Sequence, residues 1–359
     1  MIKLTFARKV VAAAVCAVAL IGPAQADDKK VYRLKLAETW PTNFGVFSAP
    51  ARNMAELAEK LSNGRLKIEI DTANKHKSAM GVFDMVRAGQ YDLGHSASYY
   101  WKGKDENTQF LTTRPFGMTA TEQYGWFYYG GGMELMQKVY EPYNLISVPG
   151  GNTGMQMGGW FRKEIKSLDD LKGLKIRIPG FAGEIFAKVG ASPTNIAPGE
   201  MYTSLERGAI DAVEWVGPSM DLRLGFHKIA PFYYSGWQEP ATELQFLINK
   251  RKFERLPADL QQILMTAMRV SAYDMTIESH HLSGQNWVAM KTEFPAVQVK
   301  SFPPEVMAAL RKANDELLAE VTAKNPLTKE IVDSQDAYLK QVRQWTDIAD
   351  RTYLNNMAE

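Results

Sequence analysis

Apolar and polar residues alternate one by one in several short segments of the chain, which is the spacing of a strand with one face on a core. Residues 31–37 and 66–70 show this pattern, and residues 46–61 between them carry apolar side chains at helical spacing. The helical segment ends at Ser62-Asn63-Gly64, because this sequence contains a glycine, which tolerates the positive φ common at helix ends. A strand, a helix and a strand in this order predict a parallel β-α-β unit.

The same patterns continue along the chain and predict an α/β fold with a second α/β block beginning near residue 145. Further strands are expected at residues 91–96, 144–148, 155–161, 174–178 and 209–215, and further helices at residues 80–88, 184–189 and 200–207. The last third is predicted to be mostly helical, over residues 257–293, 304–324 and 327–356. A long final helix fits either bracing across two lobes, pairing with a second subunit, or ordinary surface packing.

Residues 86–93 and 205–212 resemble each other weakly. In both, a predicted helix ends at a glycine, a strand follows, and aromatic residues come next. Parallel sheets bind ligands beyond the carboxyl ends of their strands. Two such ends facing each other would form a cleft, although similarity over eight residues also arises by chance.

The first 26 residues have the form of a secretory signal peptide. Lys3, Arg8 and Lys9 precede an apolar run of 12 residues, too short to span a bilayer, and Ala24-Gln25-Ala26 provides a small-x-small cleavage site. We therefore expect cleavage after Ala26 and a periplasmic protein. Removal of this segment takes away three of the 42 basic and none of the 40 acidic residues, so the net charge becomes −1.

Composition narrows the function further. The chain has 359 residues, which fits two lobes better than one core. A net charge near zero gives no reason to expect a nucleic-acid partner. Its only cysteine, Cys16, lies in the expected signal peptide, so the mature protein has no disulfide, thiol nucleophile or thiolate metal site.

The sequence contains none of the common catalytic motifs that we considered. It has no phosphate-binding loop with the Walker spacing, no H-E-x-x-H and no G-x-S-x-G. Gly130-Gly131-Gly132 lacks the spacing of a dinucleotide-binding turn. The five histidines show no metal-binding spacing, and we expect them to be structural or solvated. We therefore predict that the protein is not an enzyme.

Two polar residues near the ends of predicted strands are candidates for binding an organic acid. Arg177 lies on the polar face of residues 174–178, and a planar guanidinium can hold a carboxylate with two parallel hydrogen bonds. Its alternative is a solvent-facing strand arginine. Glu214 ends an apolar strand next to Trp215, so its carboxylate needs a cation or hydrogen-bond donors there. Its alternative is a helix cap or a salt bridge.

The remaining candidates come from a turn, a glycine-rich segment and an aromatic cluster. Glu239 offers a second carboxylate in a turn, or a simple surface charge. Gln156 lies among glycines, where its amide oxygen could bind a hard cation, and that segment also suits a crossing between lobes. Tyr99 and Tyr100 precede Trp101 and either line a small-molecule site or fill the core.

Two segments carry a resemblance to a known family. Residues 167–180, Ser-Leu-Asp-Asp-Leu-Lys-Gly-Leu-Lys-Ile-Arg-Ile-Pro-Gly, resemble a signature of the periplasmic solute-binding proteins of TRAP (tripartite ATP-independent periplasmic) transporters. Residues 208–215, Gly-Ala-Ile-Asp-Ala-Val-Glu-Trp, are similar to its second signature. The resemblance extends over the whole mature chain. It implies the two-lobed type II-like periplasmic binding protein fold, with hinge strands, long C-terminal helices and a membrane permease as partner.

Within this family the chain is most similar to the branch that binds 2-oxo acids and lactate. The resemblance implies that Arg177 pairs with the ligand carboxylate and that a Na⁺ or Ca²⁺ ion bridges ligand and protein. It places the metal ligands on Gln156, Glu214, the Trp215 carbonyl and Glu239, with Glu243 as an alternative to Glu239. The substrate contacts that we expect are Arg177, Gln156, Trp215, Tyr100, Tyr99 and Asn152.

We accordingly expect lobe I to comprise residues 27–150 with part of residues 238–300, and lobe II to comprise residues 151–237 with part of residues 301–326. Residues 327–359 would form a bracing or oligomerising helix, with a homodimer as one outcome. The expected ligand is a small 2-oxo or 2-hydroxy monocarboxylate resembling pyruvate or lactate. A C4-dicarboxylate or sugar acid is the alternative within the family, and a secreted enzyme acting on a small organic acid is the alternative of another class.

Overall fold

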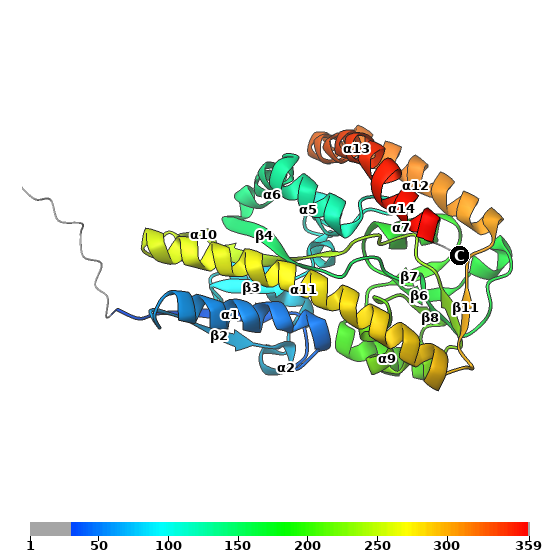
Figure 1. The fold of residues 1–359 in the computed structure, drawn as a ribbon, viewed down its shortest axis with the longest axis horizontal. Helices are drawn as coiled ribbons and strands as arrows, with labels where there is room; N and C mark the ends of the chain where they lie inside the picture. Colours follow the sequence, from blue (N-terminus) through cyan, green and yellow to red (C-terminus); the bar gives the residue numbers. More distant parts are fainter. Residues whose placement is uncertain (1–29, 358–359) are drawn as a thin grey trace, which may run out of the picture.

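The structure is a computed structural model that describes residues 30–357, so the expected signal peptide and its cleavage site lie outside the described residues. It has two separate mixed sheets covered by helices, which confirms the predicted two-lobed α/β fold (Figure 1). The five-stranded sheet of lobe I has the order β2 (Leu66–Asp71), β1 (Tyr32–Glu38), β3 (Leu93–Ser96), β10 (Glu243–Asn249) and β4 (Leu145–Asn152). The six-stranded sheet of lobe II has the order β11 (Gln298–Lys300), β9 (Phe232–Tyr234), β5 (Gly159–Phe161), β8 (Ala212–Val213), β6 (Lys175–Arg177) and β7 (Ser192–Thr194).

The predicted β-α-β unit is present, because β1 and β2 pair in parallel around α1 (Ala49–Leu61). This helix begins three residues later than the sequence pattern predicts. Gly45 has a φ of +57° and begins a short 3-10 turn that ends at Phe47. Pro50 then lies in the first turn of α1, where the backbone N–H that proline lacks would have no partner within the helix.

Strand β10 was not predicted, although it lies at the centre of lobe I. It runs antiparallel to both neighbours, so that Phe246 is opposite His95 on β3 and Val148 on β4. All seven residues of β10 are buried, so the strand lacks the alternation of buried and exposed residues that identifies a half-exposed strand. Its partners are about 100 to 150 residues away in the sequence, so no local pattern indicates the pairing.

The chain crosses between the lobes after β4, again before β10, and along α11. Residues 153–158 form the first crossing, so the strand predicted at residues 155–161 is confined to β5. Helix α11 (Ala258–Glu293) packs on α1 and β4 of lobe I and then on α9 (Pro218–Leu224) of lobe II (Figure 1). A helix of 36 residues is long enough to span both lobes.

The C-terminal helices also contact both lobes. Helix α12 (Pro304–Lys324) packs on α7 (Gly180–Lys188) of lobe II, whereas α13 (Pro326–Thr346) packs on α5 (Ala120–Tyr129) and α6 (Gly132–Tyr140) of lobe I. The helix predicted over residues 327–356 is interrupted, because a π-helical turn at Asp347–Arg351 separates α13 from α14 (Thr352–Met357). The remaining helices are α2 (Ala73–His76), α3 (Val82–Arg87), α4 (Gln109–Thr112), α8 (Met201–Glu206) and α10 (Lys250–Phe253).

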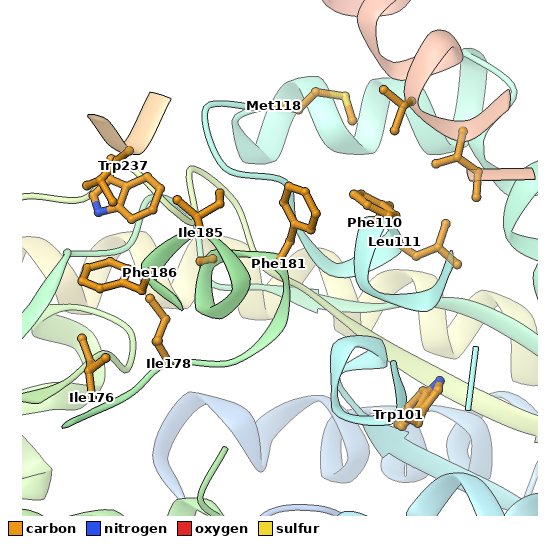
Figure 2. Packing of buried hydrophobic residues seen from close by; sticks show 14 of the residues in the cluster. Trp101, Phe110, Leu111, Met118, Ile176, Ile178, Phe181, Ile185, Phe186 and Trp237 are labelled. Atoms are coloured by element: carbon orange, nitrogen blue, oxygen red, sulfur yellow. The ribbon is translucent and has the colours of Figure 1, made fainter. Parts of the chain in front are cut away.

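One cluster of buried apolar side chains continues from lobe I into lobe II. Phe110 of α4 packs against Phe181 of α7 with ring centroids 5.3 Å apart, and Figure 2 shows the two rings side by side. Trp237, on the second crossing, packs on Phe186 of α7 at 5.7 Å. Among residues 30–357, no helix is both long and apolar enough to cross a membrane.

Candidate functional site

Arg177 ends β6 and is completely buried, so the alternative of a solvent-facing strand arginine is wrong, and its role as a ligand contact stays a prediction. Strand β6 is covered by neighbouring strands on both sides, and its carboxyl end points toward lobe I. Its Nη1 donates to the Glu214 carbonyl at 2.7 Å and lies 3.3 Å from Glu214 Oε2. Its Nη2 lies 3.5 Å from the Tyr100 hydroxyl, and its Nε has no hydrogen-bond partner among the described residues.

The two segments that resemble each other meet at this arginine. Gly89 and Gly208 end their helices with φ values of +75° and +72°, and the strands β3 and β8 follow. Each strand leads to an aromatic residue, Tyr100 in lobe I and Trp215 in lobe II. The Arg177 guanidinium touches both, since its Cζ lies 5.0 Å from the centre of the Trp215 ring. The carboxyl ends of the two sheets therefore face each other across the site.

Glu214 and Glu239 bring two carboxylates into the same buried region. Their side chains are 0% and 1% exposed, and one oxygen of each, Oε1, has no hydrogen-bond partner within residues 30–357. Burial and the nearby Glu239 raise the pKa of Glu214, while Arg177 opposes that change. Burial also raises the pKa of Glu239 to about 7, against the effect of the Thr242 hydroxyl and of Arg177. Burial and mutual repulsion therefore oppose ionisation of both carboxyl groups, and one guanidinium alone does not balance them when both are ionised.

Gln156 joins this group through a threonine that the sequence did not single out. Its Nε2 donates to Thr153 Oγ1 at 3.0 Å and to Thr242 Oγ1 at 2.9 Å, and the Thr242 hydroxyl in turn donates to Glu239 Oε2. These bonds fix the amide orientation and leave Gln156 Oε1 buried without a partner. Thr242 carries no distinctive spacing in the sequence, and only the folded hinge shows that it links Gln156 to Glu239.

Trp215 is held by aromatic side chains of the opposite lobe. Phe47 stacks on its ring at 5.3 Å, and Phe44 meets it edge-on at 5.9 Å. Both phenylalanines belong to the loop and turn between β1 and α1, and the sequence analysis missed them as site residues. The indole Nε1 of Trp215 is buried without a hydrogen-bond partner.

Tyr99 and Tyr100 form the lobe I side of the site. Their rings meet edge to face with centroids 4.8 Å apart, and Tyr99 is 6% exposed. The backbone of Gly180, which has a φ of +64°, packs on Tyr99: a Cβ there would lie 3.5 Å from Tyr99 Cβ and 3.6 Å from the ring, an ordinary van der Waals contact. Both tyrosines are therefore in contact with lobe II.

Asn152 and Glu243 form a different cluster within the hinge. Glu243 accepts hydrogen bonds from the amides of Gly150 at 3.0 Å and Gly151 at 3.2 Å, and from Asn152 Nδ2 at 3.1 Å. The Asn152 amide also donates to Gln123 Oε1, and its oxygen accepts from the Gly154 amide. None of these hydrogen-bond partners belongs to the group around Arg177, and the expected substrate contact of Asn152 and the alternative metal role of Glu243 stay predictions.

The oxygen atoms near Arg177 fit a hard cation by their chemistry. Gln156, Glu214 and Glu239 each present one buried oxygen that accepts no hydrogen bond. Carboxylate and amide oxygens are the usual ligands of Na⁺- or Ca²⁺-type ions. Within residues 30–357 no group of three His, Cys, Asp or Glu side chains could hold a metal ion, so the cation would depend on this mixed set.

The two lobes are in contact over the whole site. Besides the aromatic contacts, Arg223 of α9 donates to the Asn43 carbonyl of lobe I at 2.9 Å. Arg177, Glu214, Glu239 and Gln156 are all at most 1% exposed. A ligand can reach Arg177 from solvent only when the lobes separate.

Comparison with known proteins gives a consistent result. The sequence profile of bacterial extracellular solute-binding protein family 7 (DctP) matches residues 36–325. A monocarboxylate 2-oxoacid-binding periplasmic protein from Nostoc sp. is 38% identical over 324 residues, which cover 90% of this chain and 88% of that protein.

Two crystal structures have the same fold. A TRAP periplasmic solute-binding protein from Pseudoalteromonas atlantica, with bound sodium and pyruvate, is 62% identical and superposes with a TM-score of 0.90 over 91% of this chain and 99% of that chain. A TRAP transporter solute-binding protein from Bordetella bronchiseptica is 32% identical, with a TM-score of 0.88 over 91% of this chain and 97% of that chain. It is a mixed-occupancy dimer with calcium and picolinate bound in one site and the other site empty.

Proposed function

This chain belongs to bacterial extracellular solute-binding protein family 7, and from that premise we propose that it is a TRAP receptor for small 2-oxo monocarboxylates such as pyruvate. The single observation that carries the proposal is the buried Arg177 beside unpartnered oxygens of Glu214, Glu239 and Gln156. A buried guanidinium with an unused Nε needs an acceptor, and a ligand carboxylate provides one.

A cation explains why two more carboxylates lie beside a site for an anion. The ligand, Glu214 and Glu239 would together place three negative charges near one arginine, which is unfavourable without further positive charge. Gln156, Glu214 and Glu239, with the Trp215 carbonyl, would hold Na⁺ or Ca²⁺, and the ion would supply the missing positive charge. Pyruvate and picolinate, the ligands of the two related structures, both carry a second donor atom on the carbon next to the carboxylate. This shared chemistry favours 2-substituted acids over plain ones.

The two lobes would bind the acid by closing around it. Once water is excluded, the attraction between Arg177 and the carboxylate strengthens because the surroundings have a low dielectric constant. Tyr100, Phe44 and Phe47 would close the site from lobe I. Six non-hydrogen atoms at about −1.5 kcal/mol each limit the affinity for pyruvate to roughly the sub-micromolar range.

Titration calorimetry of the mature protein tests the function. Pyruvate, 2-oxobutyrate, lactate, acetate and succinate are titrated in choline buffer without metal, and then with Na⁺ or Ca²⁺ added. We expect pyruvate to bind at least tenfold more tightly than acetate, and the cation to strengthen binding. Equal affinities for pyruvate and acetate, or no binding of any 2-oxo acid, would contradict the proposal.

A dicarboxylate fits the site less well than a 2-oxo acid. Of the arginines that the structure describes as buried, Arg114 is bonded to Asp336 and only Arg177 adjoins the two glutamates. A second carboxylate would therefore lack a cationic partner. An enzyme acting on the same acid would need a base with access to it, and incubation of the protein with 2-oxo and 2-hydroxy acids followed by product analysis tests that alternative.

We further propose that the chain is exported to the periplasm after cleavage behind Ala26 and delivers its ligand to a TRAP membrane permease. Its family membership supports the compartment and the permease, and the apolar segment before Ala24-Gln25-Ala26 supports the cleavage. N-terminal sequencing of the exported protein is expected to begin at Asp27, and a first residue elsewhere would contradict the assigned cleavage site.

A homodimer is proposed from two exposed apolar surfaces. The end of α13 and α14 expose apolar side chains of Trp345, Ile348, Tyr353, Leu354 and Met357, each more than 60% exposed. The groove between α5 and α11 is lined by tyrosines and aliphatic side chains, including the exposed Tyr129 and Tyr273. We propose that each groove receives the C-terminal segment of a second copy. The Bordetella relative is a dimer, which supports a pair of copies but says nothing of how they pair. Light scattering of a chain truncated after residue 346 is expected to give a monomer; a monomeric full-length chain would contradict the proposal.

A further inference from the structure

Lys102 connects the two lobes through its side chain, and its ammonium group bonds to groups that are not among the proposed ligand contacts. It follows the Tyr99–Trp101 turn of lobe I, and its Nζ lies 2.7 Å from Glu184 Oε1 and 3.0 Å from the Gly180 carbonyl. Both acceptors belong to α7 of lobe II, whose first residue, Gly180, comes three residues after Arg177. One ammonium group therefore makes two polar contacts across the boundary between the lobes.

We infer that Lys102 is a closure latch that slows ligand release by stabilising the closed arrangement of the lobes. The inference rests on the proposed function, since it assumes that the lobes open to release an acid. The ion pair and the bond to the Gly180 carbonyl join groups of different lobes. Separation of the lobes at this point would break both bonds. It would leave intact the groups of each lobe that contact the ligand, so the latch would affect the opening of the lobes and not the ligand contacts themselves.

The position of the latch suits a contact that is reversible. Lys102 and Glu184 are 34% and 36% exposed, so water can replace each partner when the bond breaks. An exposed ion pair contributes little, and a hydrogen bond to a carbonyl adds a comparable amount. Together they would change the release rate by about threefold to tenfold, which can adjust the lifetime of the complex without locking it.

A neighbouring ion pair provides a matched control. Lys104 Nζ lies 2.8 Å from Asp84 Oδ2, and these side chains are 42% and 45% exposed. The pair has nearly the same length and exposure as Lys102–Glu184, but both partners belong to lobe I. Loss of this pair therefore removes a similar exposed interaction without affecting the contact between the lobes.

The test measures pyruvate release by stopped-flow tryptophan fluorescence for wild type, Lys102→Met, Lys102→Arg and Lys104→Met. We expect Lys102→Met to raise the release rate about threefold to tenfold, with an association rate within twofold of wild type and an unchanged melting temperature. Lys102→Arg is expected to restore most of the slow release, and Lys104→Met to behave like wild type. Raising the ionic strength with choline chloride, at constant Na⁺ and Ca²⁺, should speed release from wild type more than from Lys102→Met.

A second measurement needs no ligand. The mature chain is expected to contain no cysteine, so spin labels on Lys60→Cys in lobe I and Lys163→Cys in lobe II report the distance between the lobes. Lys102→Met is expected to shift the distribution of this distance toward longer values. Unchanged release and unchanged distances in Lys102→Met would overturn the latch, as would equal effects of Lys102→Met and Lys104→Met. If wild type binds no 2-oxo acid, the proposed function fails, and the label distances still decide the latch.

Discussion

Buried carboxylates occur in two kinds of surroundings in this protein. Asp221 accepts four hydrogen bonds, from the amides of Val216 and Gly217, from Trp160 Nε1 and from the Tyr233 hydroxyl. Glu214, which is equally buried, keeps one oxygen without a hydrogen-bond partner in the part of the chain that the structure describes. Glu243 resembles Asp221, and Glu239 resembles Glu214.

The difference between the two surroundings indicates what each carboxylate does. A buried polar atom without a partner is unfavourable, and a folded protein keeps such atoms mainly where something else binds. Asp221 holds the turn before α9 and fixes two aromatic side chains, so its role is structural. Glu214 and Glu239 are incomplete in the protein alone and would be completed by a cation and an acid. Substitutions should therefore affect stability at Asp221 and binding at the residues around Arg177.

The largest effect is expected at the arginine. Arg177→Ala removes the one guanidinium that the described residues place beside Glu214 and Glu239, and it leaves the ligand carboxylate unpaired. The affinity for pyruvate should therefore fall more than about 100-fold. Titration calorimetry measures this loss, and circular dichroism checks that the variant is folded. An affinity within about tenfold of wild type would contradict the assigned role.

Asp221→Ala is expected to destabilise the fold without changing the site. The substitution leaves four donors around Asp221 without an acceptor, and the free energy of unfolding should fall by about 3 kcal/mol or more. Urea unfolding measures the change, and the folded fraction should still bind pyruvate with an affinity close to that of wild type. Glu239→Ala serves as the comparison, because it should weaken binding but lower stability much less. If Asp221→Ala weakened binding and Glu239→Ala mainly lowered stability, the distinction between structural and ligand-binding carboxylates would be wrong.

Glu239→Gln is expected to reduce the response to cations. The amide keeps an acceptor for the Thr242 hydroxyl but lacks the negative charge, so Na⁺ or Ca²⁺ should enhance pyruvate binding about tenfold less than in wild type. Calorimetry with and without each ion measures this, and Glu243→Gln is the control. If Glu243→Gln alone lost the cation response, the second carboxylate ligand would be Glu243.

His95, like Asp221, is a buried polar residue whose hydrogen bonds are complete, and it should make the stability of the fold depend on pH. Its Nδ1 accepts from Trp40 Nε1 at 3.0 Å and its Nε2–H donates to the Gly150 carbonyl at 2.9 Å, so the neutral ring is fully bonded. Burial lowers the pKa of His95 to about 4, against the effect of the Gly150 carbonyl. The folded state thus disfavours the charged ring, and this contribution to stability is present above pH 6.5 and lost as the pH falls toward 4.

The measurement for His95 is a difference between two proteins. From pH 7 to pH 5, the unfolding free energy of wild type relative to His95→Gln should fall by about 2 kcal/mol. Burial raises the pKa of Glu38, which lies 3.9 Å from His95, to about 8. Because Glu38 is present in both proteins, subtraction largely removes its contribution. A constant difference across this range would show that His95 does not titrate as described.

The smallest effect is expected at the tyrosine that meets Arg177. Tyr100→Phe removes a hydroxyl 3.5 Å from Arg177 Nη2 while keeping the ring, so the affinity for pyruvate should fall about threefold. Tyr143→Phe removes a hydroxyl near Asp105, away from the site, and should leave binding unchanged. A loss above 100-fold for Tyr100→Phe would mean that this hydroxyl, rather than the arginine, is a main ligand contact.

The sequence grouped the candidate residues more accurately than it described the surroundings of each one. The two motif segments identified Arg177, Glu214 and Trp215, which the structure brings into contact. Alternation placed Arg177 on the polar face of its strand and left a solvent-facing arginine open as the alternative. Periodicity distinguishes two faces of a strand, but it does not show whether the polar face is covered by another lobe. Thr242 and Phe47 were missed for the same reason, since their roles arise from contacts across the hinge and between the lobes.

Prediction of the fold from sequence was likewise accurate for local units and failed for elements that depend on distant contacts. The unit of β1, α1 and β2 is local in sequence, and its pattern was sufficient to predict it. Strand β10 is uniformly buried and pairs with distant strands, so neither alternation nor a hairpin signal marked it. Helices α5 and α6 were also missed, in a segment rich in aromatic residues and glycine.

The central claim is that Arg177 holds the carboxylate of a 2-oxo acid between the two lobes. The most direct test is a crystal structure of the mature protein grown with pyruvate and either Na⁺ or Ca²⁺. We expect the pyruvate carboxylate within hydrogen-bond distance of the Arg177 guanidinium, and the ion between pyruvate and the oxygens of Gln156, Glu214 and Glu239. Pyruvate bound elsewhere, with Arg177 still paired only to Glu214 and Tyr100, would contradict the account.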